Sequence, residues 1–238
     1  MRPFAYVLSL SVAALAQPAS ADEIVGQPEG EAIVYRVDGF DRVAQGIAGA
    51  VDVRVGPAWS VRAYGPAAAL ADLEVEREGQ SLRLRPRNGW RDGRLLRQVR
   101  VAVTMPRLVS ASVGGSGRMT VEGARGPQLN AAVGGSGSLA LGTVAVDELA
   151  VSIGGSGGIT AAGTAGRLKV SSSGSGGFAA PGLRVASAAV SAAGSGSVRA
   201  AVAGPATVSL AGSGSVNLGP AAQCTTRRVG SGRVTCGA

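Results

Sequence analysis

Seven serines recur at nearly constant spacing in the second half of this 238-residue chain, each at the centre of a Gly-Ser-Gly tripeptide. A serine hydroxyl can act as a nucleophile when a neighbouring base activates it. The chain contains no histidine, so it lacks the usual general base and the commonest transition-metal ligand. We therefore expect these serines to hydrogen-bond to the backbone of the tight turn, or to the serine one coil away, rather than to catalyse a reaction. They are Ser116, Ser136, Ser156, Ser175, Ser195, Ser213 and Ser231.

Glycine-rich repeats can also bind calcium or nucleotide phosphates. Calcium-binding repeats of the form G-G-x-G-x-D would place an aspartate three residues after each serine. Here that position is apolar in all seven repeats, from Met119 in the first to Val234 in the last. A dinucleotide-binding fingerprint requires a helix after the glycines, whereas each tripeptide here precedes a strand pattern. The sequence thus predicts no metal or nucleotide cofactor.

Carboxylates are scarce in the same region. Glycoside hydrolysis generally needs a pair of carboxyl groups that flank the scissile bond, and residues 111–238 contain only Glu122, Asp147 and Glu148. Asp147 and Glu148 are adjacent in sequence and Glu122 belongs to another repeat, so we expect all three to be solvated surface groups. The sequence therefore favours a non-enzymatic protein. The alternative is a polysaccharide-active β-helix enzyme.

The repeat indicates the architecture. Its serines are 20, 20, 19, 20, 18 and 18 residues apart, and positions −7, −5, −3, +3 and +5 relative to each serine are mostly apolar. Polar or small residues lie between them, and alternation at period two is typical of a half-buried strand. The pattern therefore predicts that each repeat forms a strand, a bend and a second strand. Stacked units of this kind predict an all-β fold, a single β-solenoid with coils of 18–20 residues.

The only two cysteines fall at informative positions in the last repeat. Cys224 is at position −7 and Cys236 at position +5. If the chain folds back at the bend, position −7 faces position +5. We therefore predict a disulfide that pins the final coil.

The first 21 residues are typical of a secretory signal peptide. Arg2 gives a positive start, residues 6–16 form an apolar core, and Ala19-Ser20-Ala21 is a small-residue cleavage site. The mature chain would begin near Asp22. No later stretch reaches the roughly 18 to 20 apolar residues of a membrane helix. We expect an exported protein, either periplasmic or extracellular at the cell surface, with no transmembrane segment after cleavage.

Residues 22–35 form an N-terminal segment ahead of a solenoid domain at 36–238, in which strands are irregular to about residue 110 and the repeats occupy 108–238. The best helical candidate is the short stretch 67–73, which follows Pro66. Partial alternation between glycine and proline breaks predicts strands at 33–37, 50–55, 59–64, 71–77, 81–85 and 99–105.

Outward positions suggest where a ligand could bind. Residues 111–238 carry eight arginines and Lys169 against three acids, a formal charge of +6, and such a surface attracts anionic polymers. Polar outward positions also form rows along the solenoid, which either match a repeating polymer or simply keep small residues in solvent; we favour the second reading. One row is Ser112, Ala132, Ser152, Ser171, Ser191, Ser209 and Arg227.

A second candidate site is the stretch 85–100, which contains Trp90, Arg91, Arg94 and Arg97. An indole beside guanidinium groups could stack on sugars and pair with carboxylate or phosphate. The alternative is a turn at Asn88-Gly89 whose Trp90 covers the open end of the solenoid. Nucleic acid is not an expected partner, because the chain has an export signal and lacks repeated aromatics.

The chain resembles a family of exported bacterial proteins, the putative autotransporter adhesin head GIN domain. The resemblance covers about residues 36–238 and rests on Val37-Asp38-Gly39-Phe40, on Thr104-Met105-Pro106 leading into 108–113, and on the Gly-Ser-Gly ladder. It implies a right-handed β-helix-like solenoid and a role in adhesion. It brings no catalytic or binding residues. The expected partner is an anionic polysaccharide, another envelope component or a protein.

Overall fold

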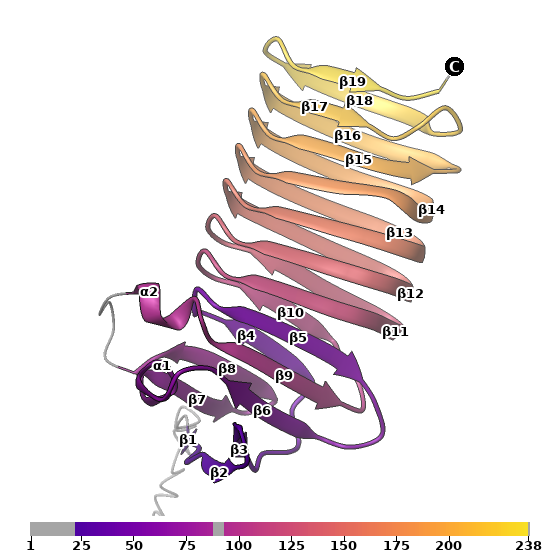
Figure 1. The fold of residues 1–238 in the computed structure, drawn as a ribbon. Coiled ribbons are helices and arrows are strands. Elements are labelled where there is room, and N and C mark those ends of the chain that lie inside the picture. The colour runs from indigo at the N-terminus through magenta and orange to yellow at the C-terminus, as the bar shows by residue number, and fades with distance from the viewer. Residues whose placement is uncertain (1–21, 88–92, 238) are drawn as a thin grey trace, which may run out of the picture.

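The computed structural model describes residues 22–87 and 93–237, and most of these residues lie in strands (Figure 1). Within them, 19 strands form one sheet that winds into a flattened coil, and two short helices, α1 (Ala67–Ala71) and α2 (Gly93–Leu96), lie beside its N-terminal end. The predicted all-β solenoid is confirmed. The signal-peptide prediction, Trp90 and Arg91 lie outside the described residues.

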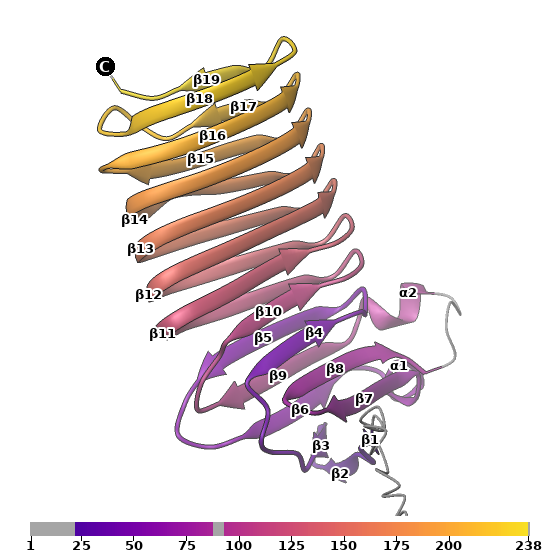
Figure 2. The same ribbon diagram turned by 180° about the vertical axis from the view of Figure 1, so that it is seen from behind.

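The coil has two faces. We call the face turned toward the viewer in Figure 1 the front sheet, and the face seen in Figure 2 the back sheet. Each regular coil crosses the front sheet after its Gly-Ser-Gly bend, turns at the opposite edge and returns along the back sheet to the next bend. Four long strands make this circuit: β11 (Arg118–Val133), β12 (Ser138–Gly155), β13 (Gly158–Gly174) and β14 (Gly177–Gly194).

Later coils are shorter, and the circuit divides into separate strands. The front-sheet pieces pair in parallel, as do the back-sheet pieces. The front-sheet strands are β15 (Ser197–Val202), β17 (Ser215–Asn217) and β19 (Arg233–Thr235), and the back-sheet strands are β16 (Pro205–Gly212) and β18 (Gln223–Val229).

The core is a thin layer of aliphatic side chains between the two sheets. In the coil around Ser156, the five positions predicted to point inward are at most 5% exposed. They are Leu149, Val151, Ile153, Ile159 and Ala161. The sequence pattern missed further buried residues at the edge opposite the bends, including Val144 and Val146 in one coil and Leu183 and Val185 in another.

The N-terminal coils do not stack in chain order. After β4 (Arg42–Gln45) and β5 (Ala50–Val55), the chain leaves the solenoid and returns to build a coil beneath them from β8 (Ser81–Pro86) and β9 (Arg100–Met105). The chain then continues on the other side of the first coil, where β10 (Ser110–Val113) pairs with β4 and β11 pairs with β5. The repeat alone does not predict this crossing.

Antiparallel strands close the N-terminal end. β6 (Ser60–Tyr64) pairs with β9, and β7 (Leu73–Glu78) pairs with β8. The segment at 22–35 belongs to this closure, because β3 (Ala32–Tyr35) pairs with β6, β2 (Gln27–Glu29) with β3, and β1 (Asp22–Glu23) with β7. The predicted strands at 33–37, 50–55, 59–64, 71–77, 81–85 and 99–105 match β3, β5, β6, β7, β8 and β9 closely, and the predicted helix overlaps α1.

The Gly-Ser-Gly bends stack backbone on backbone. The amides of Ser136 and Gly137 both donate to the carbonyl of Gly115 one coil below, at 3.1 and 2.8 Å. A Cβ on Gly137 would lie 2.5 Å from the carbonyl oxygen of Gly117, and one on Gly135 would lie 2.7 Å from that of Gly115. Real Cβ atoms do not approach so closely, so both glycines are needed for the coils to meet at this edge.

The coil formed by β4 and β5 makes the same turn without a Gly-Ser-Gly tripeptide. Here Gln45 occupies a buried inward position, and its side-chain amide donates to the carbonyls of Ile47 at 3.1 Å and Gly49 at 2.7 Å. The Gln45 side chain thus supports this turn together with Gly49, at which a Cβ would lie 2.3 Å from the carbonyl oxygen of Val99.

The last described coil closes the C-terminal end. Cys224 and Cys236 form the expected disulfide, with Cα atoms 6.0 Å apart. Arg228 occupies a position that other coils fill with inward side chains such as Leu210, with which it pairs, and its guanidinium donates to the carbonyl of Gly232 at 3.1 Å. A charge in this place discourages further strand addition at the open edge.

Substitution of alanine in one bend tests the backbone stacking. Gly137→Ala should lower the free energy of unfolding by about 1–3 kcal/mol, because its Cβ would overpack against the carbonyl of Gly117. Gly134→Ala is the matched control, since a Cβ there has no atom within 4 Å. Chemical denaturation of both variants is the measurement. Equal stability of the two variants would contradict the stacking explanation.

Candidate functional site

The seven bend serines lie in one exposed row along the edge of the solenoid. Their backbone groups hold the coils together, but their hydroxyls point to solvent. Ser213 and Ser231 share a hydrogen bond between hydroxyls at 3.2 Å, and the other five hydroxyls have no hydrogen bond within the described parts of the chain. Among the residues that the structure describes, no acidic or basic side chain hydrogen-bonds to any of them. The row therefore has the geometry of a structural repeat.

The arginines of the solenoid form the main electrostatic feature. All eight are exposed, and none of them forms an ion pair with a carboxylate among the residues that the structure describes. Lys169 differs, because its ammonium group lies 2.9 Å from Glu148. The eight are Arg118, Arg125, Arg167, Arg184, Arg199, Arg227, Arg228 and Arg233.

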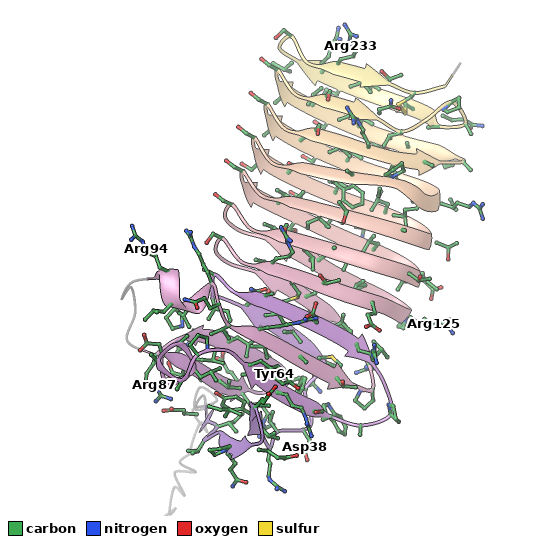
Figure 3. All side chains as sticks on the ribbon, in the orientation of Figure 1. Asp38, Tyr64, Arg87, Arg94, Arg125 and Arg233 are labelled. Carbon is green, nitrogen blue, oxygen red and sulfur yellow. A yellow bond between two sulfur atoms is a disulfide. The ribbon has the colours of Figure 1, made fainter. Side chains whose placement is uncertain are left out.

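The arginines are spread over both sheets and over the edge opposite the bends. Arg199 and Arg233 lie on the front sheet two coils apart. In the coil between them, Asn217 pairs with Arg199 and Ser215 pairs with Arg233. Arg125 lies in an edge row that passes through Ala145 and Thr164 before it reaches Arg184. Figure 3 shows Arg125 and Arg233 extending away from the body.

One row of the back sheet carries mostly small side chains. Strand pairing places Ser112, Ala132, Ser152, Ser171, Ser191, Ser209 and Arg227 side by side, in the row expected from the repeat. Neighbouring members of such a row are about 4.8 Å apart. The row presents hydroxyls and methyl groups at regular intervals, with a cation at its last coil.

The three acids of the solenoid are surface groups. Both oxygens of Glu122 accept hydrogen bonds from Arg54, each at 2.7 Å, and these bonds lower the pKa of Glu122. A general acid for glycoside hydrolysis needs the opposite, a raised pKa. Glu148 pairs with Lys169, and Asp147 is exposed. In the described chain, no cluster of three or more metal-ligating side chains could hold a metal ion.

The structure places only part of the predicted Trp90 site. Arg94 lies on α2 and Arg97 just beyond it, both exposed, and Figure 3 shows Arg94 directed away from the solenoid. Leu96 between them is 3% exposed and anchors the helix. Trp90 and Arg91 fall in the undescribed stretch, so the proposed grouping of an indole with these guanidinium groups stays a prediction.

A hollow in the front sheet was not foreseen from the sequence. We call it the front hollow; it has a volume of about 540 Å³. Ala102 lies at its centre. The neighbours of Ala102 along the strand, Arg100 and Thr104, are larger, and so are its cross-strand neighbours, Arg62 and Asp52. No sequence signal marks it, because its walls come from non-sequential coils. Its lining residues are Asp52, Val53, Arg54, Tyr64, Arg100, Ala102, Val103, Thr104 and Glu122.

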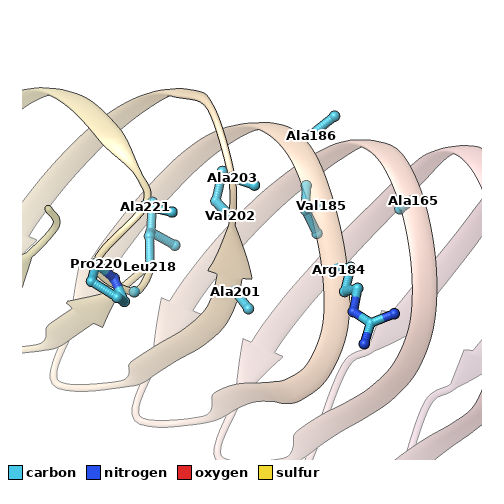
Figure 4. A pocket seen from close by; sticks show the side chains of 11 residues that line it. Ala165, Arg184, Val185, Ala186, Ala201, Val202, Ala203, Leu218, Pro220 and Ala221 are labelled. Carbon is cyan, nitrogen blue, oxygen red and sulfur yellow. The ribbon is translucent and has the colours of Figure 1, made fainter.

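An apolar notch of about 420 Å³ lies at the edge opposite the bends, where the coils shorten (Figure 4). Pairing between β14 and β15 jumps from Ala180 to Arg184, and the three residues between them have no partner in the next coil. The notch is lined mainly by alanine, valine and leucine side chains. In Figure 4, the guanidinium of Arg184 extends away from Val202 and Leu218, so the notch offers no directed polar group.

The fold and the composition of its surface define a β-solenoid that presents cationic and small polar groups on stacked coils. The chain belongs to the family described as "Putative auto-transporter adhesin, head GIN domain", whose model matches residues 39–219. No functionally curated protein matches the chain. No helix in the described ranges is both long enough and apolar enough to span a bilayer.

Solved structures of bacterial proteins share the fold. A putative adhesin from Bacteroides fragilis is similar with a TM-score of 0.80 at 22% identity, over 88% of this chain and 98% of that one. A protein named a putative lipid binding protein, from Parabacteroides distasonis, gives 0.68 at 18% identity over 89% and 98%. A putative adhesin from Parabacteroides merdae gives 0.66 at 17% identity over 91% and 95%. At these identities the similarity establishes the fold.

Proposed function

We propose that this protein is an exported, non-enzymatic adhesion module that holds an anionic polymer of the cell envelope or its surroundings against the solenoid. One observation carries the proposal: eight exposed arginines of the solenoid face solvent without carboxylate partners in the described chain. Uncompensated guanidinium groups attract polyanions over long range and bind carboxylate or sulfate groups at contact. The family description, an adhesin, supports this assignment.

The shape of the surface supports the same proposal. A solenoid with coils at about 4.8 Å spacing presents repeated groups along its length, and the arginines recur along that length from Arg118 to Arg233. A polymer with a charge on each repeat unit could contact several of them at once. Multiple weak contacts of this kind give useful overall affinity without a deep pocket.

The carboxylates of the repeat coils give the enzyme alternative little support. Glu122 and Glu148 are each engaged by a cation, and the bend serines have no activating partner. An adhesion module that only binds needs none of these groups. Incubation of the polymer with the protein, followed by a measurement of polymer length, separates the two functions, because an enzyme would shorten the polymer with time.

Charge removal on the front sheet tests polymer binding. The double variant Arg199→Asn, Arg233→Ser replaces each arginine with the residue type that pairs with it in the adjacent coil. Binding of polygalacturonate and dextran sulfate should weaken roughly 10–30-fold at low salt, because each cation near an anionic surface contributes about 1 kcal/mol. Any binding of uncharged dextran should be the same in this variant as in the unmodified protein. Affinity measured by biolayer interferometry at low and physiological salt is the readout.

A charge-matched control uses arginines that already have partners. Arg42→Ser, Arg62→Ser lowers the net charge by the same amount, but Arg42 lies near Asp41 and Arg62 near Glu29. This control should bind the polymers almost as well as the unmodified protein. An equal loss in both variants would mean that only net charge matters, and tight binding by the front-sheet variant would refute the assignment.

A further inference from the structure

We propose that the front hollow is a binding site for one neutral sugar ring of a glycan. The proposal goes beyond the polyanion binding described above, because it concerns different residues and requires no charge on the ligand. It rests on the shape of the hollow, on the unused hydrogen-bonding atoms around it and on the balance of its charges.

The floor of the hollow is small and apolar. Ala102 supplies a methyl group at the centre, and Val53 and Val103 direct their side chains into the core, so their backbone completes the floor. Tyr64, across the strand pair from Arg100, adds an aromatic wall with a hydroxyl at its tip. A sugar ring has an apolar face of C–H groups and a rim of hydroxyls, which fits an apolar floor with a polar rim.

Polar atoms around the rim have unused hydrogen-bonding capacity. Arg100 donates through Nε to Oδ2 of Asp52 at 2.7 Å, which leaves its terminal nitrogens and the second oxygen of Asp52 without partners among the described residues. The hydroxyls of Tyr64 and Thr104 likewise form no hydrogen bond there. Donors and acceptors therefore lie close together, and a sugar hydroxyl both donates and accepts.

The ion pairs hold these groups in place before a ligand arrives. Arg54 and Glu122 form a two-bond pair across stacked coils, and Arg100 and Asp52 form another. Side chains that are already oriented lose less entropy on binding. The two guanidinium groups balance the two carboxylates, so the rim has no net charge that would favour an anionic ligand. This balance separates the front hollow from the unpaired arginines of the later coils.

Filling the hollow tests the proposal. Ala102→Leu would project a branched side chain into the space, whereas Ala140→Leu places the same side chain at an equally oriented outward position of the front sheet, in line with Thr120 and Asp52. The probes are methyl glycosides of glucose, galactose, mannose and N-acetylglucosamine, and short neutral oligosaccharides. Binding is measured by saturation-transfer NMR and calorimetry on the disulfide-intact protein.

At least one probe should bind saturably, and Ala102→Leu should weaken it about tenfold or more while Ala140→Leu leaves it unchanged within about twofold. Tyr64→Phe should weaken binding by removing one hydroxyl without changing the floor, and thermal unfolding should show that all three variants are folded. Binding should persist in about 1 M salt, where charges more than a few ångströms apart are screened.

Three results would overturn the proposal. They are the absence of binding to every neutral probe, an equal loss in Ala102→Leu and Ala140→Leu, and binding that disappears in salt or in the Arg199→Asn, Arg233→Ser variant. The last result would assign the sugar to the arginine surface instead. Because Ala102→Leu leaves all solenoid arginines in place, its polyanion binding should be unchanged, so the two proposals can fail independently.

Discussion

The solenoid depends on direct contact between backbones at the Gly-Ser-Gly bends. In the five bends from Ser136 to Ser213, two amides donate to one carbonyl of the bend below, and the flanking glycines leave no space for a Cβ. This contact sets the distance between coils at one edge, and parallel pairing along both sheets follows from it. With few aromatics in the chain, the core is too thin to fix that distance through large side chains. The repeat is therefore best understood as a packing requirement.

That constraint determines where recognition can occur. Inward positions are mostly apolar and the bends need glycine where backbones touch, so outward positions are the most free to vary between coils. In the later coils these positions carry arginines that have no carboxylate partner in the described chain, and in the N-terminal coils they carry ion pairs around a small central alanine. The two surfaces differ in charge balance, which is why we assign a polyanion to one and a neutral sugar ring to the other.

Local patterns in the sequence predicted much of the fold. Alternation at period two located the strands and their inward residues, and the position of Cys224 relative to Cys236 predicted the disulfide. The sequence could not reveal that the coil of β8 and β9 lies beneath that of β4 and β5, because stacking order leaves no periodic signal. The front hollow was missed for the same reason: Ala102, Asp52 and Glu122 meet only through that crossing. The turn supported by Gln45 was hidden because its residues, 45–49, do not contain the Gly-Ser-Gly tripeptide.

The most direct test of this account is to remove the serine hydroxyls while keeping the glycines. Serines 136, 156, 175 and 195 would be replaced together by alanine, and unfolding by denaturant would be compared with that of the unmodified protein, together with binding to dextran sulfate. If the bends serve backbone stacking alone, the midpoint, the steepness of the transition and the affinity should all be unchanged. A clear loss of stability or of binding would show that the hydroxyl row itself contributes, and would contradict the central claim.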